Sequence, residues 1–279
     1  MLEPSAGTPE ETKQKTAAAY NAASDTYEHE ANSFWSRFGR RTVMRIGLKE
    51  GARVLDVCCG SGASAIPAAE TVGERGFVLG VDLAEKLLNL GTKKANQRAL
   101  RNVEFRQGDL LQLNLEAESF DAVICVFGIF FIPDMEAAMR ELWRFVMPNG
   151  KLAITTWGAR FFEPASTGFW NSIQSVRPDL YKSFNPWYRI SEPAALEKLF
   201  VRAEIPGCQI GAEAGTQPVR KPEDWWSMVL GTGYRGTVEQ LSERDYEVVR
   251  LKNLDYIKDA EVRAVEANVL YAVAEKTKR

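Results

Sequence analysis

The sequence contains almost no histidine, few cysteines and no long apolar run. Its single histidine is His29, and its four cysteines are Cys58, Cys59, Cys125 and Cys208. The cysteines lack the spacing of zinc ligands. The longest apolar stretch, residues 122–132, is much shorter than the roughly 20 residues that span a bilayer. We therefore expect no bound metal, reduced thiols and no integral membrane association.

Neither sign of charge is in excess. The 279 residues include 35 Lys and Arg and 37 Asp and Glu, which gives a formal net charge of −2 at pH 7. This balance argues against the basic footprint of a nucleic-acid-binding protein and against a polybasic membrane patch. Residues 1–12 contain no apolar signal core. We expect a cytoplasmic protein that binds no nucleic acid.

The segment VLDVCCGSGASA joins an apolar run to a glycine-rich turn. Residues 54–57 predict a buried strand, and residues 58–62 predict a tight turn before a helix. Gly60, Gly62 and Ala65 fit the pattern G-x-G-x-x-[GA]. Such a turn lets the backbone approach a ligand, and the helix N-terminus offers free N–H groups. The pattern indicates a nucleotide-type ligand without identifying it.

A carboxylate follows at the spacing that a ribose requires. Asp82 lies 20 residues beyond Gly62, at the end of an apolar segment expected to be the second strand. At this spacing a carboxylate reaches ribose hydroxyls in an open α/β sheet. Asp82 would also serve as the N-cap of a helix expected over 84–98, and it can fill both roles.

Strands and helices alternate at short intervals between residues 52 and 157. Strands are expected over 76–82, 102–109, 120–131 and 151–157. A helix is expected over 135–147. This alternation predicts an α/β fold with a Rossmann-like, doubly wound, mainly parallel sheet. Ligands bind such sheets beyond the carboxyl ends of the strands.

The amino-terminal segment is expected to be largely helical. Residues 1–8 are expected to be disordered, although Thr8 and Glu11 form a capping-box pattern for a helix over 9–23. A second amphipathic helix is expected over 33–47. These helices can pack as a flap over the ligand site, or they can simply cover a sheet edge.

The carboxyl third is rich in aromatic residues. Helical structure is expected over 192–203 and 222–259, and strands over 208–219 and 262–276. Five of the seven tryptophans lie at residue 157 or later. This enrichment is consistent with insertions that form a lid over an apolar substrate, and equally with ordinary packing between helices.

Two ligand classes use a glycine turn followed by an acid about 20 residues later, namely nicotinamide dinucleotides and S-adenosylmethionine (SAM). The sequence has no Tyr-x-x-x-Lys pair, and its only histidine precedes the glycine motif. These absences weaken the case for a nicotinamide-dependent oxidoreductase without excluding it. A SAM-binding regulator without turnover is a third possibility.

Several motifs occur together in an order that resembles a known family. VLDVCCGSG, GVDLAEKLL, FRQGDLLQL, SFDAVICVFGIFFIPD and LWRFVMPNGKLAITTW are similar to the successive motifs of class I SAM-dependent methyltransferases. They resemble in particular the type 11 group, which includes the ubiquinone and menaquinone biosynthesis methyltransferases. The resemblance covers residues 50–157. One departure is Cys58, because the family has glycine at this position of its D-x-G-x-G-x-G pattern.

The resemblance implies a SAM site and a division of the chain. It implies that the site comprises Tyr20, Tyr27, Asp56, Cys59, Gly60, Ser61, Gly62, Asp82, Leu83, Gly108, Asp109, Leu110, Val126 and Phe127. Asp56 would reach the amino group of SAM directly or through water, Asp82 the ribose hydroxyls, and Asp109 the adenine amino group. The expected division is a helical flap (1–49), a SAM-binding core (50–157) and a segment that completes the sheet and adds substrate-lid insertions (158–279).

The resemblance also implies the chemistry, which is in-line transfer of the SAM methyl group with S-adenosylhomocysteine (SAH) as product. The acceptor would be a small apolar or aromatic molecule, as in secondary metabolism, methylated at O, N or C. The acceptor-site candidates are Phe34, Trp35, Phe131, Trp157, Trp170 and Trp187. His29 is the only side chain that is a neutral-pH base by type, and it is the candidate catalytic base. We expect a monomer or a homodimer.

Overall fold

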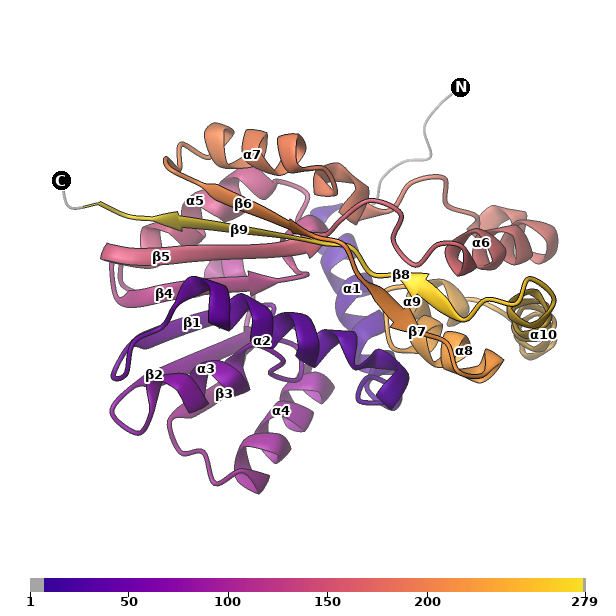
Figure 1. The fold of residues 1–279 in the computed structure, drawn as a ribbon, viewed down its shortest axis with the longest axis horizontal. Coiled ribbons are helices and arrows are strands. Elements are labelled where there is room, and N and C mark those ends of the chain that lie inside the picture. Colours follow the sequence, from indigo (N-terminus) through magenta and orange to yellow (C-terminus); the bar gives the residue numbers. More distant parts are fainter. Residues whose placement is uncertain (1–7, 278–279) are drawn as a thin grey trace.

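The computed structural model describes residues 8–277, and a seven-stranded sheet forms its centre (Figure 1). The strand order is β3-β2-β1-β4-β5-β9-β6. These strands are β1 (Arg53–Val57), β2 (Phe77–Asp82), β3 (Val103–Gln107), β4 (Phe120–Val126), β5 (Val146–Trp157), β6 (Gln209–Glu213) and β9 (Val269–Glu275). Of the segment expected to be disordered, residues 1–7 lie outside the described residues.

The strands β1 to β5 pair in parallel, which confirms the predicted doubly wound, mainly parallel sheet. Leu55 of β1 lies opposite Leu79 of β2 and Val123 of β4. The run of apolar residues in β4 is typical of a strand that is buried on both faces. Strand β9 is antiparallel and lies between β5 and β6, so the carboxyl third completes the sheet.

Helices cover both faces of the sheet. They are α2 (Phe34–Ile46), α3 (Ala65–Val72), α4 (Glu85–Gln97), α5 (Met135–Phe145) and α7 (Pro193–Arg202). Val54 and Ile124 belong to one apolar core with residues of α2 and α3. Leu55 and Val123 belong to the other core, which includes residues of α5. Successive strand residues point to opposite faces, so these apolar strands supply both cores.

Helix α1 (Pro9–Ala23) packs against α4 and α9 (Arg235–Val238). The predicted capping box is present, because the Glu11 N–H donates to Thr8 Oγ1 at 3.2 Å and the Thr8 N–H donates to the Glu11 carboxylate at 2.8 Å. A one-turn 3-10 helix, η1 (Glu30–Asn32), leads into α2. The amino-terminal segment is therefore helical, as expected.

The remaining helices gather where the parallel strands end (Figure 1). They are α6 (Ala165–Val176), α8 (Pro222–Leu230), α9 and α10 (Glu243–Asp259), with 3-10 helices η4 (Pro178–Leu180) and η5 (Pro186–Ile190). Helix α10 packs against α6 and α8. A second, two-stranded sheet of β7 (Thr216–Pro218) and β8 (Ala264–Glu266) joins this group to the main sheet. These elements form the helical insertions expected in the carboxyl third.

Several predicted boundaries are wrong. The strand expected over 120–131 ends at Val126, because Phe127 has a φ of +55° and a 3-10 helix, η3 (Ile129–Phe131), follows. The segment 208–219 forms two strands in different sheets, and 262–276 divides in the same way. Strand β5 begins at Val146 rather than at the predicted Lys151. Val146 already pairs with Phe120 of β4, and a bulge separates this pair from that of Ala122 with Lys151.

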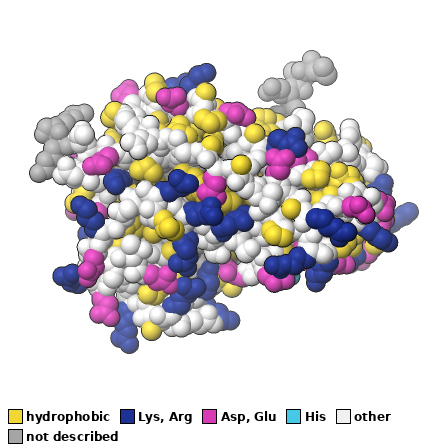
Figure 2. All heavy atoms as spheres, in the orientation of Figure 1, with side chains coloured by type: hydrophobic (Ala, Val, Ile, Leu, Met, Phe, Trp, Pro, Cys, Tyr) yellow, Lys and Arg dark blue, Asp and Glu magenta, His cyan; other side chains and the backbone are white. Residues whose placement is uncertain are grey.

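The face drawn in Figure 2 carries basic side chains with acidic side chains among them. Helix α2 supplies some of these basic side chains, and most of its arginines have carboxylate partners. Arg41 and Arg45 pair with Glu213, and Arg40 lies 3.6 Å from Glu70. None of the helices within residues 8–277 has the length and apolar character needed to cross a membrane.

Candidate functional site

A cavity of about 460 Å³, called here the main cavity, lies at the carboxyl ends of β1, β2 and β4 beneath α1. Twelve residues of the sequence-predicted site line it: Tyr20, Tyr27, Trp35, Gly60, Asp82, Leu83, Gly108, Asp109, Leu110, Val126, Phe127 and Phe131. They come from α1, from the segment between α1 and η1, from α2, from the ends of β1 to β4 with the turns that follow them, and from η3. The fold thus brings together residues that are separated by more than one hundred positions in the sequence.

The glycine turn and the end of β2 are joined at the floor of the main cavity. The Gly60 N–H donates to Asp82 Oδ2 at 2.8 Å, and the Ala84 N–H donates to Asp82 Oδ1 at 2.8 Å. Gly60 has a φ of +53°, and a Cβ there would lie 3.1 Å from the Tyr27 hydroxyl oxygen. Glycine is therefore favoured by both the backbone conformation and the close approach of the flap. Burial raises the pKa of Asp82, although the two N–H donors oppose this effect.

Cys58 lines the main cavity at the position where the resembled pattern has glycine. Its φ of +54° lies in the left-handed region, which costs a non-glycine residue roughly 1–2 kcal/mol. Gly128 makes room for it, since a Cβ at residue 128 would lie 2.2 Å from Cys58 Cβ. A hydrogen bond with Cys125 and burial raise the pKa of the Cys58 thiol well above its usual value. Cys58 and Gly128 are thus a complementary pair, and the thiol is neutral.

Asp56 lies beneath the glycine turn and does not line the main cavity. It is 0% exposed, and its Oδ2 accepts a hydrogen bond from Ser64 Oγ at 2.7 Å. Its Oδ1 has no hydrogen-bond partner within residues 8–277. Burial raises the pKa of Asp56 to about 7, against the lowering effect of the Ser64 hydroxyl. Of the two contacts predicted for Asp56, only the water-mediated one fits this position.

The flap contributes an aromatic wall to the main cavity. The Tyr27 and Trp35 rings are stacked, with centroids 5.2 Å apart and an interplanar angle of 8°. Tyr20 meets Phe131 edge to face at 5.7 Å. Burial raises the pKa values of both tyrosines above the usual value, so both hydroxyls stay neutral. The wall is apolar but presents two phenolic hydroxyl groups.

Asp109 is held at the opposite end of the main cavity by α1. Its Oδ2 lies 2.7 Å from Lys13 Nζ, and its Oδ1 accepts the Leu111 N–H at 3.1 Å. Lys13 also pairs with Glu10 at 2.7 Å. One oxygen of Asp109 therefore caps the N-terminus of the 3-10 helix η2 (Leu110–Gln112). The other connects α1 to the end of β3 through the ion pair with Lys13.

Comparison with known proteins identifies the family of the chain. A model of the ubiE/COQ5 methyltransferase family matches residues 10–184, which is more than half of the sequence. The chain belongs to the ubiE/COQ5 methyltransferase family. The family resemblance inferred from the motifs is thereby confirmed.

Two curated relatives of this methyltransferase family show the extent of the likeness. Demethylmenaquinone methyltransferase of Bacillus cereus is 34% identical over 140 residues, which cover 50% of this chain and 57% of the relative. Aklanonic acid methyltransferase DauC of Streptomyces sp. is 34% identical over 144 residues, which cover 52% of this chain and 66% of the relative. The matched region therefore spans less than two thirds of each relative's length.

Solved structures confirm the fold of this family member. The [4+2]-cyclase SpnF superposes with a TM-score of 0.60 at 18% identity, and 98% of each chain is covered. The YcgJ protein of Bacillus subtilis superposes with a TM-score of 0.58 at 16% identity, covering 87% of this chain and 100% of that one. The first of these is named as a cyclase, so this fold does not by itself decide the reaction.

Three predicted cofactor residues lie behind the glycine turn rather than in the main cavity. Cys59 is 4% exposed, and burial raises the pKa of its thiol well above the usual value. A Cβ at Gly62 would lie 2.7 Å from Phe105 Cζ, so this glycine serves packing against the sheet. Ser61 is buried and bonds to side chains outside the cavity. Only the backbone of this part of the turn can therefore be close to a ligand.

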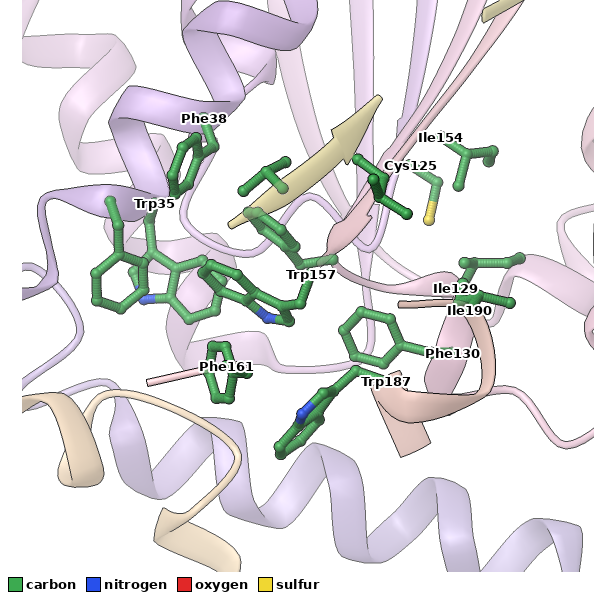
Figure 3. Close-up of a cluster of buried hydrophobic side chains, with 14 of the residues drawn as sticks. Trp35, Phe38, Cys125, Ile129, Phe130, Ile154, Trp157, Phe161, Trp187 and Ile190 are labelled. Atoms are coloured by element: carbon green, nitrogen blue, oxygen red, sulfur yellow. The ribbon is translucent and has the colours of Figure 1, made fainter. Parts of the chain in front are cut away.

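Four predicted acceptor residues are buried in the aromatic core, part of which Figure 3 shows. They are Phe34, Trp157, Trp170 and Trp187. Trp157 stacks on Phe127 with centroids 4.0 Å apart, one layer behind the cavity wall. The indole nitrogens of Trp170 and Trp187 have no acceptor within residues 8–277. None of these four residues lines the main cavity, and their contact with an acceptor stays a prediction.

His29, the candidate base, does not line the main cavity. It is an exposed residue whose Nδ1 accepts the Ala31 N–H at 3.1 Å and caps η1. It lines a smaller cavity of about 120 Å³ on the other side of Tyr27 and Trp35. This location favours a capping role over proton transfer from an acceptor.

Sequence reasoning missed several residues that line the main cavity. They are Thr8, Glu10, Lys13, Thr16, Ala17, Cys58, Val81, Ala84, Leu87, Leu111, Gln112, Gly128, Ile132 and Pro133. The positions in α1 recur at helical spacing with Tyr20, which was predicted. That periodicity could have identified these α1 positions once Tyr20 was placed in the site.

Proposed function

We propose that this chain transfers a methyl group from SAM to a small apolar or aromatic acceptor by in-line displacement. One observation carries the proposal. In a member of the ubiE/COQ5 methyltransferase family, the main cavity collects the glycine turn, Asp82 and Asp109 beneath an aromatic wall. These groups match the ribose, adenine and methionine parts of SAM that the motifs predict.

The residues of the main cavity fit SAM. Asp82 would accept hydrogen bonds from the ribose hydroxyls, since its carboxylate lies at the cavity floor. Leu83 and Leu110 would flank adenine, with Asp109 at its amino group. The Tyr27 hydroxyl lies beside Gly60 in the main cavity, where it can donate to the methionine carboxylate. SAM supplies an electrophilic methyl group on a sulfonium.

The protein contributes alignment and exclusion of water. The stacked Tyr27 and Trp35 rings and the Phe127 ring enclose the end of the cavity near β4. A displacement that disperses charge is favoured when the reactants are aligned and desolvated, and alignment can account for roughly 7–11 kcal/mol of barrier lowering. The described lining contains no histidine. We therefore infer that the acceptor arrives as a neutral amine, an acidic phenol or a comparably activated nucleophile.

The acceptor end of the main cavity is apolar. Tyr20, Phe131, Ile132 and Pro133 line it, and Tyr20 and Phe131 are in contact. Two relatives are named for demethylmenaquinone and aklanonic acid. Both the lining and these names favour a ring-containing, largely apolar acceptor over a cationic amine. We further propose a cytoplasmic protein that acts as a monomer or homodimer without a metal.

The direct test is incubation of the purified protein with methyl-labelled SAM and a panel of hydroxylated aromatic compounds, amines and cell extract, followed by mass spectrometry. We expect a labelled product from an aromatic acceptor together with one equivalent of SAH. Asp82→Ala should abolish most of the product, whereas Asp121→Ala is the matched control. Asp121 also binds a backbone N–H, that of Arg53, but at the opposite end of the sheet. Binding of SAM with no labelled product from any source would favour a regulator.

A further inference from the structure

A polar side-chain cluster lies directly behind the cofactor turn. Lys94 Nζ donates to Glu28 Oε1 at 2.8 Å and to Ser61 Oγ at 3.1 Å. Ser61 Oγ in turn donates to Glu28 Oε1. The three side chains form a closed ring of hydrogen bonds in which every member has two partners. They border the smaller cavity of about 120 Å³, which shares Tyr27 and Trp35 with the main cavity.

The three members of the cluster come from three parts of the fold. Glu28 follows Tyr27 in the flap, Ser61 follows Gly60 in the turn after β1, and Lys94 lies on α4. Both Tyr27 and Gly60 line the main cavity. The cluster therefore connects the aromatic wall of the cavity to its glycine floor through residues that do not themselves line the main cavity.

We infer that Glu28, Ser61 and Lys94 form a clasp that holds the flap closed on the bound cofactor. Glu28 and Lys94 are thus positioning residues for the proposed SAM site, and the inference rests on the proposed function. The main cavity lies beneath the flap, so movement of the flap away from the glycine turn would widen the path by which SAH leaves. Opening the clasp would separate a carboxylate from an ammonium group and from a buried hydroxyl.

The geometry makes this contact stronger than an ordinary surface pair. The Lys94 side chain is 24% exposed and that of Glu28 is 45% exposed, while Ser61 is 1% exposed. Partly buried charges are screened less by solvent and salt than fully exposed ones. Loss of one member also deprives each of the other two of one of its two partners. A second tether, Lys13 to Asp109, lies at the other end of the cavity and does not involve the glycine turn.

The test measures SAH dissociation from the full-length protein by stopped-flow tryptophan fluorescence, which Trp35 beside Tyr27 should report. We expect Lys94→Met and Glu28→Gln each to speed SAH dissociation by roughly threefold to tenfold, which lies in the lower part of the range for coupled neighbours. Arg98→Met is the matched control. Arg98 lies at the end of the same helix and pairs with Glu70 on α3 rather than with Glu28 or Ser61. Its dissociation rate should equal that of the wild type.

Exchanging the two charged residues of the clasp distinguishes loss of the clasp from a general structural effect of each substitution. The double variant Glu28→Lys with Lys94→Glu should restore a dissociation rate within about twofold of the wild type, because the hydroxyl of Ser61 can donate or accept. Unchanged rates in both single variants would overturn the inference. If a charge variant does not fold, Ser61→Ala decides, because it removes one member of the ring and keeps both charges: faster SAH dissociation supports the clasp, and an unchanged rate contradicts it. A wild type that binds no SAH would instead refute the proposed function.

Discussion

The backbone N–H of Gly60 donates to a carboxylate oxygen of Asp82 across 2.8 Å, so the turn after β1 is fixed to the end of β2. The same carboxylate accepts the Ala84 N–H and faces the main cavity. One side chain thus shapes the glycine turn and is also the proposed ribose-binding group. The two roles can be separated by substitution.

Asp82→Ala should weaken SAH binding by at least tenfold, because both the ribose contact and the anchor of the Gly60 turn are lost. Hydrogen bonds to charged groups contribute roughly 1.5–3 kcal/mol, so a loss of this size is expected. Asp82→Asn keeps an acceptor for one backbone N–H and should fall between the alanine variant and the wild type. Titration calorimetry with SAH measures both. Equal affinities in all three proteins would mean that Asp82 does not hold the ribose.

Gly128→Ala should destabilise the protein because the new methyl group would meet Cys58 Cβ at 2.2 Å. Overpacking of this kind costs roughly 1–3 kcal/mol of unfolding free energy. Cys58→Gly in the same chain should recover most of the loss, since it removes the clashing side chain and relieves a φ of +54°. Urea denaturation of the two single variants and the double variant gives the coupling free energy between positions 58 and 128. Additive effects would show that the two positions do not depend on each other.

Asp56 should make the unfolding free energy depend on pH. Its pKa is raised to about 7 in the folded protein, so the folded state holds a proton that the unfolded state releases near pH 4. The resulting contribution to stability is present below about pH 4 and is lost as the pH rises towards 7. Asp56→Asn should remove this dependence, which amounts to about 2 kcal/mol between pH 5 and pH 7. Urea denaturation at those two pH values compares the proteins, and identical pH profiles would contradict the assignment.

His29→Asn should leave turnover within about twofold of the wild type. The imidazole caps η1 through Nδ1 and lies outside the main cavity, and asparagine is itself a good capping residue. The rate of labelled product formation between pH 6 and pH 9 is the relevant measurement. A large loss of turnover, or the disappearance in the variant of a fall in rate towards acidic pH, would restore His29 as the base.

The sequence predicted the sheet and most of the cofactor cavity because both depend on local patterns. Apolar runs identify β1 and β4, and the spacing from Gly62 to Asp82 follows from one strand–helix–strand unit. The roles of Asp56, Cys59 and Ser61 could not be resolved in the same way. Those side chains point behind the turn, and a one-residue difference within a turn decides on which side each lies.

The carboxyl third was less predictable because its elements depend on tertiary contacts. Residues 208–219 looked like one strand, but the chain leaves the main sheet after Glu213 and pairs with β8. Trp170 and Trp187 were candidates for an acceptor site on account of their bulk alone, and both are enclosed by other aromatic rings. Composition indicates that such residues cluster, but it does not indicate which ring faces a ligand. The division at residues 49 and 157 likewise stays a prediction.

Titration calorimetry of the purified protein with SAH and, separately, with NADH distinguishes SAM from a nicotinamide dinucleotide, the other cofactor class that binds to a glycine turn followed by an acid. We expect saturable binding of SAH with one site per chain and no heat with NADH. Tight NADH binding without any SAH signal would contradict the assignment of the main cavity to SAM, and with it the proposed methyl transfer.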